Sequence, residues 1–232
     1  MIYKKPRNIE NKELSFLKEF MDSSFFANIN ENHKGEVSII QEPYTGYGYA
    51  DLVCIIWDQS IRNRWPDKRN QLDITDIKIL HHLYNVKILK ENIEIAEELG
   101  FSLSKTNKSI RKLLEAELLT VNKQNKIKIK LIKEIFFIKE IISIEAKLHN
   151  WKKALEQSVN NTYFSSQSYA LFPGKIITKR LLDEYINTDV GIISFEKSYK
   201  IIKKPKRQTI PSSLSSWFFN EYIGRELCAN FK

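Results

Sequence analysis

The stretch KEIISIEAK, residues 139–147, decides the fold. Its apolar and β-branched run is typical of a strand that is buried on both faces, yet the run ends in Glu145 and Lys147. Because side chains alternate between faces along a strand, these two charged groups point the same way. Charged groups are seldom buried without a partner or a metal ion. The pattern therefore predicts a functional site at the end of this strand.

A second buried strand is predicted at 50–57, ADLVCIIW, and it opens on Asp51. It follows a Gly- and Tyr-rich turn, YTGYGY at 44–49, and an earlier strand at 36–43, EVSIIQEP, that Pro43 ends. If strands 50–57 and 139–147 pair, the carboxylates of Asp51 and Glu145 meet the ammonium group of Lys147 at one end of the sheet.

Two carboxylates beside one ammonium group are typical of an active site for metal-dependent phosphodiester hydrolysis. Mg²⁺ prefers carboxylate and carbonyl oxygens, so Asp51, Glu145 and the carbonyl of Ala146 are the predicted metal ligands, with Mn²⁺ as an alternative ion. The metal would polarise the scissile phosphate and lower the pKa of a bound water. Lys147 would orient or deprotonate that water, or neutralise charge on the phosphorane.

The rest of the chain supplies helices and further strands around this pair. Asn150 is a candidate N-cap for a helix over 151–163, with Trp151, Ala154, Leu155 and Val159 on its buried side. Helices are also predicted at 9–25, 175–187 and 212–231, and β segments at 168–173, 190–195 and 197–208. The resulting order, α-β-β-(insert)-β-α-β-α-β, predicts an α/β sandwich with helices on both sides of a small mixed sheet.

GYADLV at 48–53 and IEAK at 144–147, followed by a helix bearing Gln157 and a further strand, resemble the PD-(D/E)xK nuclease superfamily. The resemblance covers roughly 1–57 and 135–195, and Ala50 stands where the family pattern has Pro. It implies a restriction-endonuclease-like α-β-β-β-α-β core with a mixed sheet flanked by helices. It also implies metal-dependent hydrolysis of DNA to a 5′-phosphate and a 3′-hydroxyl.

The same resemblance suggests further site residues. Many members carry a Glu on the first helix, and Glu13 is the candidate because Phe16, Leu17 and Phe20 lie three, four and seven residues beyond it. Weaker candidates are Glu10 and Glu19 on the same helix, and Glu42 near the turn before Asp51. One branch of the superfamily has Gln-x-x-x-Tyr on the helix after the lysine; here Gln157 lacks the Tyr four residues on. For the three glutamates of the first helix and for Gln157, a solvated surface role is the alternative.

Between the two strands lies an insert with a different character. Residues 93–119, IEIAEELGFSLSKTNKSIRKLLEAELL, and a lysine-rich alternation at 119–131 resemble a winged helix-turn-helix over about 72–132. Helices are predicted at 74–84, 92–99 and 104–117, and the polar stretch 59–72 is interpreted as a linker. The expected domains are a nuclease core at 1–64 and 135–232, interrupted by the inserted winged helix at 65–134.

The charges of the insert suggest contact with DNA. Lysines on the third helix and the wing would contact phosphates, and Asn107, Lys108 and Arg111 are candidates for contact with base edges. The predicted DNA-binding residues are Lys105, Asn107, Lys108, Arg111, Lys112, Lys126 and Lys128. The alternative is that this winged helix is a protein-docking or dimerisation module.

Composition agrees with a nucleic-acid partner. The 232-residue chain has a formal net charge of +9 and a pI near 9.3, which favours an anionic partner, and its 42% hydrophobic content is enough for a core. Two cysteines without a CxxC pattern fit a reducing compartment, and neither a signal peptide nor a membrane-spanning run is visible. The chain is therefore expected to be cytoplasmic and off the membrane.

These observations lead to one main hypothesis, two alternative functions and one question about the oligomeric state. The main hypothesis is a Mg²⁺-dependent DNA endonuclease whose winged helix binds duplex DNA. A non-catalytic DNA-binding regulator on a nuclease fold is the first alternative, and an RNA-directed nuclease is the second. Cutting both strands would favour a homodimer or a larger nuclease complex, although no dimer motif is legible in the sequence.

Overall fold

The computed structural model describes residues 12–32, 35–46 and 48–230, and these form two compact units. One unit consists of Ser60–Phe137 together with the chain from Trp217 onward. The other holds the described residues up to Gln59 and Ile138–Ser216. The expected boundaries placed the whole closing helix with the nuclease core, whereas from Trp217 this helix belongs to the unit that contains the insert.

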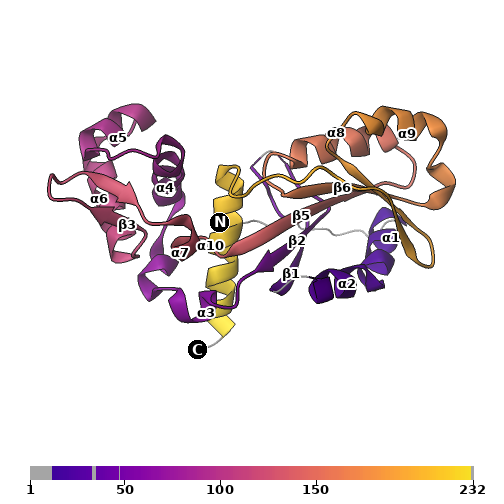
Figure 1. Ribbon diagram of the computed structural model, residues 1–232, viewed down its shortest axis with the longest axis horizontal. Coiled ribbons are helices and arrows are strands. Elements are labelled where there is room, and N and C mark those ends of the chain that lie inside the picture. The colour runs from indigo at the N-terminus through magenta and orange to yellow at the C-terminus, as the bar shows by residue number, and fades with distance from the viewer. Residues whose placement is uncertain (1–11, 33–34, 47, 231–232) are drawn as a thin grey trace. The chain divides into compact units, whose positions relative to one another are not determined.

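A six-stranded mixed sheet forms the centre of the unit that holds Ile138–Ser216, called here the sheet-containing unit (Figure 1). Its order is β1-β2-β5-β6-β7-β8; the pairs β1-β2, β2-β5 and β7-β8 are antiparallel, and β5-β6 and β6-β7 are parallel. The strands are β1 (Glu36–Gln41), β2 (Leu52–Trp57), β5 (Ile138–Ala146), β6 (Gln167–Phe172), β7 (Gly191–Phe195) and β8 (Tyr199–Lys203). The α/β class and the mixed sheet flanked by helices are therefore confirmed.

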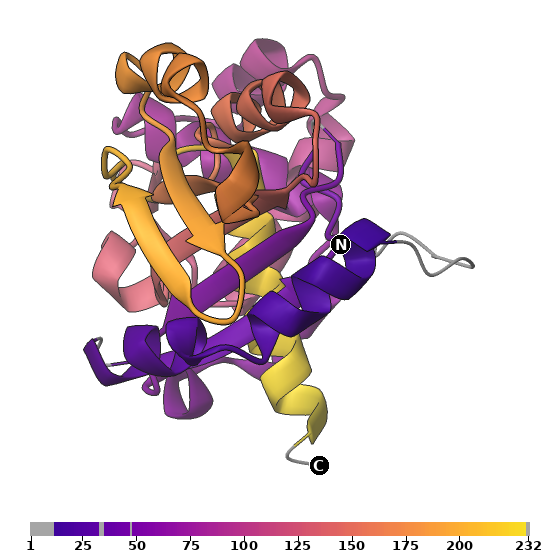
Figure 2. The ribbon, with the colours of Figure 1, turned by 90° about the vertical axis from the view of Figure 1, so that its right-hand side faces the viewer.

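Helices cover both faces of this sheet (Figures 1 and 2). On one face, α1 (Lys12–Met21) buries Leu17 and Phe20, and α2 (Ser24–Asn32) buries Phe25 and Phe26, in one core with residues of β2, β5 and β6. On the other face, α8 (Trp151–Asn161) and α9 (Lys179–Ile186) pack on β6 and β7, and a 3-10 turn (Gly174–Ile176) precedes α9. Burial of apolar side chains on both faces explains why every residue of β2 is buried.

Two sequence expectations about these helices need correction. The single helix expected at 9–25 is two helices, because the chain turns at Asp22 and Ser23, and the Ser23 hydroxyl accepts from the Phe25 N–H at 3.3 Å. On α8, Asn150 caps the first turn as expected, but Val159 is 39% exposed. The buried positions of α8 are instead Ala154, Ser158 and Asn161, spaced four and three residues apart.

The insert-containing unit, Ser60–Phe137 with the chain from Trp217 onward, has the predicted run of three helices followed by a hairpin. These are α4 (Ile74–Val86), α5 (Asn92–Leu99), α6 (Leu103–Glu115), β3 (Leu119–Val121) and β4 (Ile127–Ile129). Ile127 also forms an isolated bridge with Lys90. The unit further contains α3 (Ile61–Arg64), a 3-10 turn (Asp67–Gln71), α7 (Ile132–Ile135) and α10 (Leu214–Asn230) from Trp217 onward.

The stretch 59–72 is not a linker, because it anchors α10 within this unit. Arg69 is 1% exposed, and its guanidinium donates to the Glu221 carboxylate and, at 2.7 Å, to the Ile135 carbonyl. The guanidinium also lies 4.0 Å from the centre of the Trp65 ring. Gly224 permits the close approach of α10, since a Cβ there would lie 2.2 Å from the Trp65 indole. A polar sequence therefore forms an ordered, buried contact.

Candidate active site

A tight turn between β1 and β2 places Asp51 at the start of β2. Gly46 and Gly48 adopt positive φ angles of 88° and 149°, which a glycine accepts without strain. The Thr45 N–H donates to the Gly48 carbonyl at 2.8 Å, and the Glu42 N–H donates to the Asp51 carbonyl at 3.1 Å. These hydrogen bonds of Glu42 and Thr45 therefore hold the backbone on which the first acidic side chain stands.

The pairing of β2 with β5 brings Asp51 to the end of the other strand. Leu52 lies opposite Ile144 in the antiparallel register, so the residues that follow Ile144 run past Asp51. The Asp51 Oδ2 accepts from the Ala146 N–H at 2.9 Å and from the Lys147 Nζ at 3.1 Å. The convergence that the sequence predicted is thus present in the structure.

Glu145 is buried on the face of the sheet that α8 covers. Its side chain is 1% exposed, and its Oε1 accepts from the Nδ2 of Asn161 at 2.7 Å. Its Oε2 is buried without a hydrogen-bond partner among the described residues. Burial, and then the nearby charge of Asp51, raise the pKa of Glu145 well above its ordinary value, while the Asn161 hydrogen bond opposes this rise. A buried oxygen that lacks a partner is costly unless a ligand satisfies it.

Lys147 links the acidic groups of the site. Its Nζ donates to the Ala146 carbonyl at 2.8 Å as well as to Asp51, and it lies 3.7 Å from the Glu13 Oε2 on α1. Burial alone would lower the pKa of Lys147, but the charges of Asp51, Glu13 and Glu145 outweigh it, and the pKa is raised. The structure therefore holds this side chain as a positively charged ammonium among carboxylates.

The other candidates from the sequence fall into different places. Gln157 is half-buried on α8, and its Oε1 is buried without a partner among the described residues. Glu42 is buried and has a positive φ of 47°, next to the turn before Asp51. Glu19 is exposed, and Glu10 lies outside the described residues. The structure thus groups Glu13, not Glu19, with the charged cluster around Lys147.

Asn161 is the site residue that sequence reasoning missed. It lies one helical turn beyond Gln157, and its side chain reaches the carboxylate of Glu145. A signal existed in the sequence, because Asn161 falls seven residues after Ala154, on the same stripe of α8. The signal was hidden because the expected stripe followed the apolar Val159, which faces solvent.

The donor set fits a hard divalent cation that retains part of its water shell. Asp51, Glu145 and the Ala146 carbonyl supply oxygen donors only, and Glu145 Oε2 has no other partner among the described residues. The described part of the chain contains no group of three or more His, Cys, Asp or Glu side chains placed to hold a metal ion. Mg²⁺ is usually bound through one or two carboxylates with several waters, so two carboxylates are sufficient.

The predicted DNA-binding residues of the insert differ in their surroundings. Lys105, Lys108, Arg111 and Lys128 are exposed, and Lys126 is half-buried. Lys112 instead forms ion pairs with Asp73 at 2.7 Å and Asp76 at 3.0 Å, at the N-terminus of α4. This contact gives Lys112 a role inside the unit.

Asn107 also makes a contact within the unit. Its Oδ1 accepts from Asn92 at 2.7 Å, and it lines a groove between α6 and the hairpin together with Leu103 and Val121. This groove is partly apolar, because Leu103 and Val121 are both exposed hydrophobic side chains. The basic side chains Lys105, Lys108 and Arg111 are not among the residues that line it.

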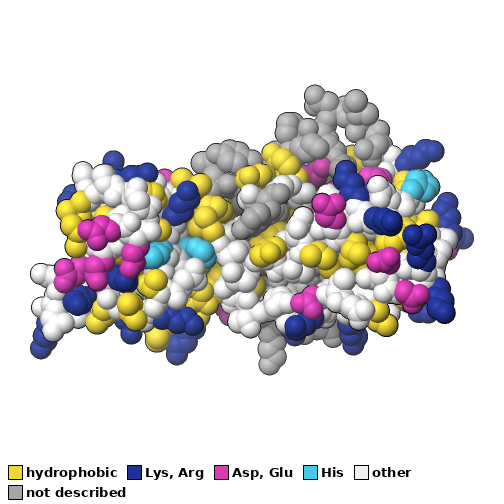
Figure 3. Space-filling view, turned by 90° about the horizontal axis from the view of Figure 1, so that it is seen from above, with side chains coloured by type: hydrophobic (Ala, Val, Ile, Leu, Met, Phe, Trp, Pro, Cys, Tyr) yellow, Lys and Arg dark blue, Asp and Glu magenta, His cyan; other side chains and the backbone are white. Residues whose placement is uncertain are grey.

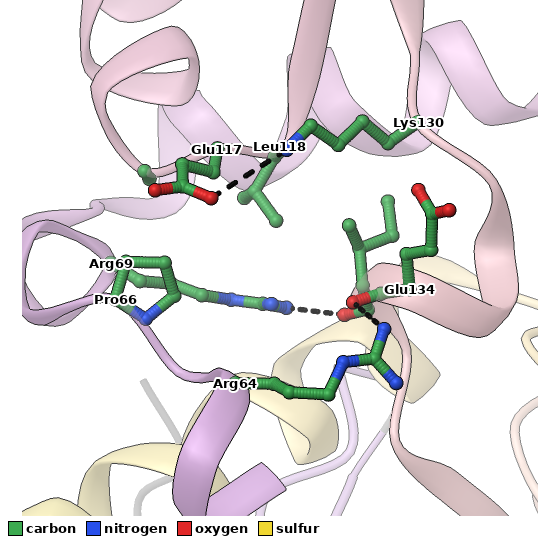
Figure 4. Close-up of a pocket in the computed structure, with 9 residues that line it drawn as sticks. Arg64, Pro66, Arg69, Glu117, Leu118, Lys130 and Glu134 are labelled. Carbon is green, nitrogen blue, oxygen red and sulfur yellow. Dashed lines mark hydrogen bonds and ion pairs between the residues drawn. The ribbon is translucent and has the colours of Figure 1, made fainter. Parts of the chain in front are cut away.

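A separate pocket in the insert-containing unit is lined by polar side chains that contact one another or the backbone (Figure 4). Arg69 points across it to the Ile135 carbonyl, and Arg64 donates to the Glu134 carbonyl at 3.0 Å. Lys130 faces Glu117 at 3.7 Å on the opposite wall. Because these cations have partners within the pocket, we assign its polar lining to the stability of this unit.

On the face drawn in Figure 3, the basic side chains do not form one patch. Figure 3 shows Lys and Arg side chains on both units, among hydrophobic and acidic ones. Among the described residues, every helix is too short or too polar to cross a lipid bilayer. No family model matched the chain, and the comparisons with curated proteins and with solved structures gave no match either.

Proposed function

We propose that this chain is a divalent-metal-dependent DNA endonuclease of the PD-(D/E)xK type, with the inserted unit acting as a winged helix that binds duplex DNA. One observation carries the proposal: Asp51 lies beside Glu145 and Lys147, which follow it by 94 and 96 residues across the insert, at the paired ends of β2 and β5. Burial of Glu145 and Lys147 beside a partly buried Asp51 is unfavourable for folding, which favours a functional reason for their presence.

The residues of the chain divide the work of phosphodiester hydrolysis. Asp51, Glu145 and the Ala146 carbonyl would hold Mg²⁺ or Mn²⁺, which supplies Lewis-acid polarisation of the phosphate and an activated water. Lys147 donates hydrogen bonds to two of these ligands, so it carries a proton in this arrangement. That geometry favours charge neutralisation on the phosphorane over the role of general base. Water adds to phosphorus, and the P–O3′ bond breaks to leave a 5′-phosphate and a 3′-hydroxyl.

The insert-containing unit supports DNA as the partner. Three helices followed by a two-stranded hairpin, with Lys90 bridging Ile127, is the element order expected of a winged helix. Lys105, Lys108 and Arg111 project from α6, the helix that would enter the major groove. Exposed lysines on such a helix contact phosphates and give salt-dependent affinity.

A non-catalytic DNA-binding regulator is the second candidate. It is favoured by the lack of a third metal-holding acidic group among the described residues, and by the two hydrogen bonds that already engage Asp51 Oδ2. This alternative expects tight duplex binding that does not depend on a divalent ion, and no strand cleavage. The unsatisfied Glu145 Oε2 counts against it, because a retired site would gain stability by losing that group.

The decisive experiment measures cleavage of linear, nicked, branched and single-stranded DNA with Mg²⁺, with Mn²⁺ and with EDTA. Matched RNA substrates test the RNA-directed alternative. Asp51→Asn and Lys147→Met should abolish cleavage, whereas Lys153→Met, at an exposed position of α8, should retain it. Full activity of either site variant would reject the assigned site, and metal-independent binding without cleavage by the wild type would favour the regulator.

A further inference from the structure

A pocket of about 500 Å³ lies within the sheet-containing unit, at the ends of its parallel strands. Three segments that follow β5, β6 and β7 line it: Leu148 and His149, Pro173 and Lys175, and Glu196 after Phe195. These strands run parallel, so their carboxyl ends lie at one edge of the sheet. Open α/β sheets bind their ligands at this edge.

Several residues that line the pocket are close in sequence to residues of the candidate active site. Leu148 and His149 directly follow Lys147, and the lining residues Lys12 and Phe16 flank Glu13 on α1. A ligand in this pocket would therefore lie next to a phosphate held at Lys147. A pocket of this size falls in the range that takes a small molecule or one nucleotide, roughly 300–1,000 Å³.

The chemistry of the lining suits a nucleobase joined to phosphate. Phe16 and Leu148 are half-buried and offer apolar surface, whereas Pro173 and Phe195 are buried; the Phe16 and Phe195 rings lie 5.8 Å apart with a tilt of 53°. Aromatic and apolar side chains of this kind stack on bases whatever their sequence. Lys12 and Lys175 are exposed cations of the lining and can contact the phosphates that flank the base, whereas Glu19 and Glu196 of the same lining would repel a phosphate, so the phosphates are expected on the lysine side.

We infer that this pocket holds one unpaired nucleotide beside the scissile phosphate, so that the substrate is DNA with a single-stranded or unstacked position at the cleavage point. A base inside an intact duplex is paired and stacked, so it enters such a pocket only after unstacking, and the cost of this step is smallest for a base that is already unpaired. This inference rests on the proposed nuclease function and makes its substrate class specific. The insert would then bind the adjoining duplex, while the pocket selects the point of cleavage.

The test separates binding from cleavage. The full-length Asp51→Asn variant is titrated with Ca²⁺ present against three DNAs: a blunt duplex, the same duplex with a 3′ or 5′ overhang, and the same duplex with an internal unpaired base. A 2-aminopurine at the unpaired position reports stacking by a change in its fluorescence. We expect the two DNAs with unpaired positions to bind at least 5-fold more tightly than the blunt duplex, with a quenched reporter.

Substitutions in the pocket should remove this preference. Phe16→Leu keeps apolar volume but removes the aromatic face, and it should weaken binding of the unpaired DNAs roughly 5- to 100-fold while leaving the blunt duplex unchanged. Lys175→Gln should act in the same direction, and Lys179→Gln, an exposed position of α9 outside the pocket lining, is its control. Melting temperatures of all variants show whether the fold is retained.

The outcomes are distinguishable from failure of the proposed function. Equal affinity for all three DNAs, or a preference that survives both pocket substitutions, overturns the pocket inference even if the enzyme cleaves DNA. A preference for unpaired DNA that the substitutions abolish shows that the pocket binds an unpaired nucleotide. If the wild type nevertheless cleaves nothing, the nuclease proposal fails, and with it the assignment of that nucleotide to a point of cleavage.

Discussion

The Nδ2 of Asn161 lies 2.7 Å from the Oε1 of Glu145, and both side chains are buried. This hydrogen bond fixes one oxygen of the carboxylate and leaves the other, Oε2, as the buried acceptor without a partner among the described residues. Residues that orient a metal ligand commonly change metal affinity or activity by 10–100-fold when they are replaced. Asn161 is therefore placed to decide how Glu145 presents its free oxygen.

Replacing this amide should weaken metal binding before it affects folding. Asn161→Leu has a similar volume but no donor, so we expect the affinity for Mn²⁺ to fall by roughly 10-fold or more. The affinity is measured by calorimetry or electron paramagnetic resonance, with no DNA present. Asn160→Leu, at the exposed neighbouring position, is the control. Unchanged Mn²⁺ affinity in a folded Asn161→Leu protein would remove Asn161 from the site.

Glu145→Gln should stabilise the protein at neutral pH in the presence of EDTA. The pKa of Glu145 is raised in the folded state by burial and by Asp51, whereas an unfolded Glu titrates near pH 4.3. The folded state therefore binds the proton more tightly, and the stability that this contributes is lost as the pH rises above about 4.3 toward the folded pKa. Removing the ionisable group removes this loss, by about 1.4 kcal/mol for every pH unit between the two pKa values.

The measurement is urea unfolding of the wild type and Glu145→Gln from pH 4 to pH 8. The difference in the free energy of unfolding should grow with pH and favour the variant. Glu156→Gln, at an exposed position on α8, should show no such trend. A wild type that is more stable than Glu145→Gln at pH 8 would contradict the burial of a costly carboxyl group.

Breaking the buried pair between Arg69 and Glu221 should destabilise the insert-containing unit. Their side chains are 1% and 4% exposed and 2.6 Å apart, so Arg69→Met would leave a buried carboxylate without its cation. Loss of one partner of a buried pair typically costs about 3–5 kcal/mol. Chemical denaturation measures this cost, and the double variant Arg69→Met with Glu221→Leu should recover much of it. A cost below about 1 kcal/mol for Arg69→Met would show that the pair contributes little.

Lys112 and Arg111 are neighbours on α6 that should behave differently. Arg111→Gln should weaken duplex binding and reduce the slope of log affinity against log salt by about 1, because an exposed cation contacts phosphate. Lys112→Gln should lower the melting temperature and leave the salt slope unchanged, because Lys112 is paired with Asp73 and Asp76. Fluorescence anisotropy at several salt concentrations measures the slopes. Equal loss of slope in both variants would return Lys112 to the DNA interface.

The local patterns of the sequence were sufficient for much of the fold and for the charged cluster. Alternation along 139–147 and the Asp near the start of 50–57 located Asp51, Glu145 and Lys147. Charged groups on a buried strand are costly unless a partner or a metal ion balances them, so their presence in these strands was informative. Helical periodicity located Glu13 on α1, and its carboxylate lies 3.7 Å from Lys147. The specific nuclease fold and the winged helix remain predictions.

What the sequence could not reveal depends on partners that are distant along the chain. Arg69 looks like part of a polar linker until Glu221, 152 residues later, is placed beside it. Lys112 looks like a solvated cation until Asp73 supplies its partner. The buried stripe of α8 consists of Ala154, Ser158 and Asn161, and two of these residues are polar. A search for apolar residues alone therefore selected Val159 and passed over Asn161. Hydrogen bonds and ion pairs between residues that are far apart in the chain produce no periodic pattern in the local sequence.

The contact between Arg64 and α7 has a consequence for the order of folding. The guanidinium of Arg64 reaches the carbonyls of Lys133 and Glu134, so the two ends of the inserted segment lie close together once it has folded. The entropy lost on closing a flexible loop increases with its length, and β2 and β5 are separated by the whole insert. A locally folded insert converts that long loop into a short one. We therefore expect the helices of the insert to form before the central strand pairing that creates the charged cluster.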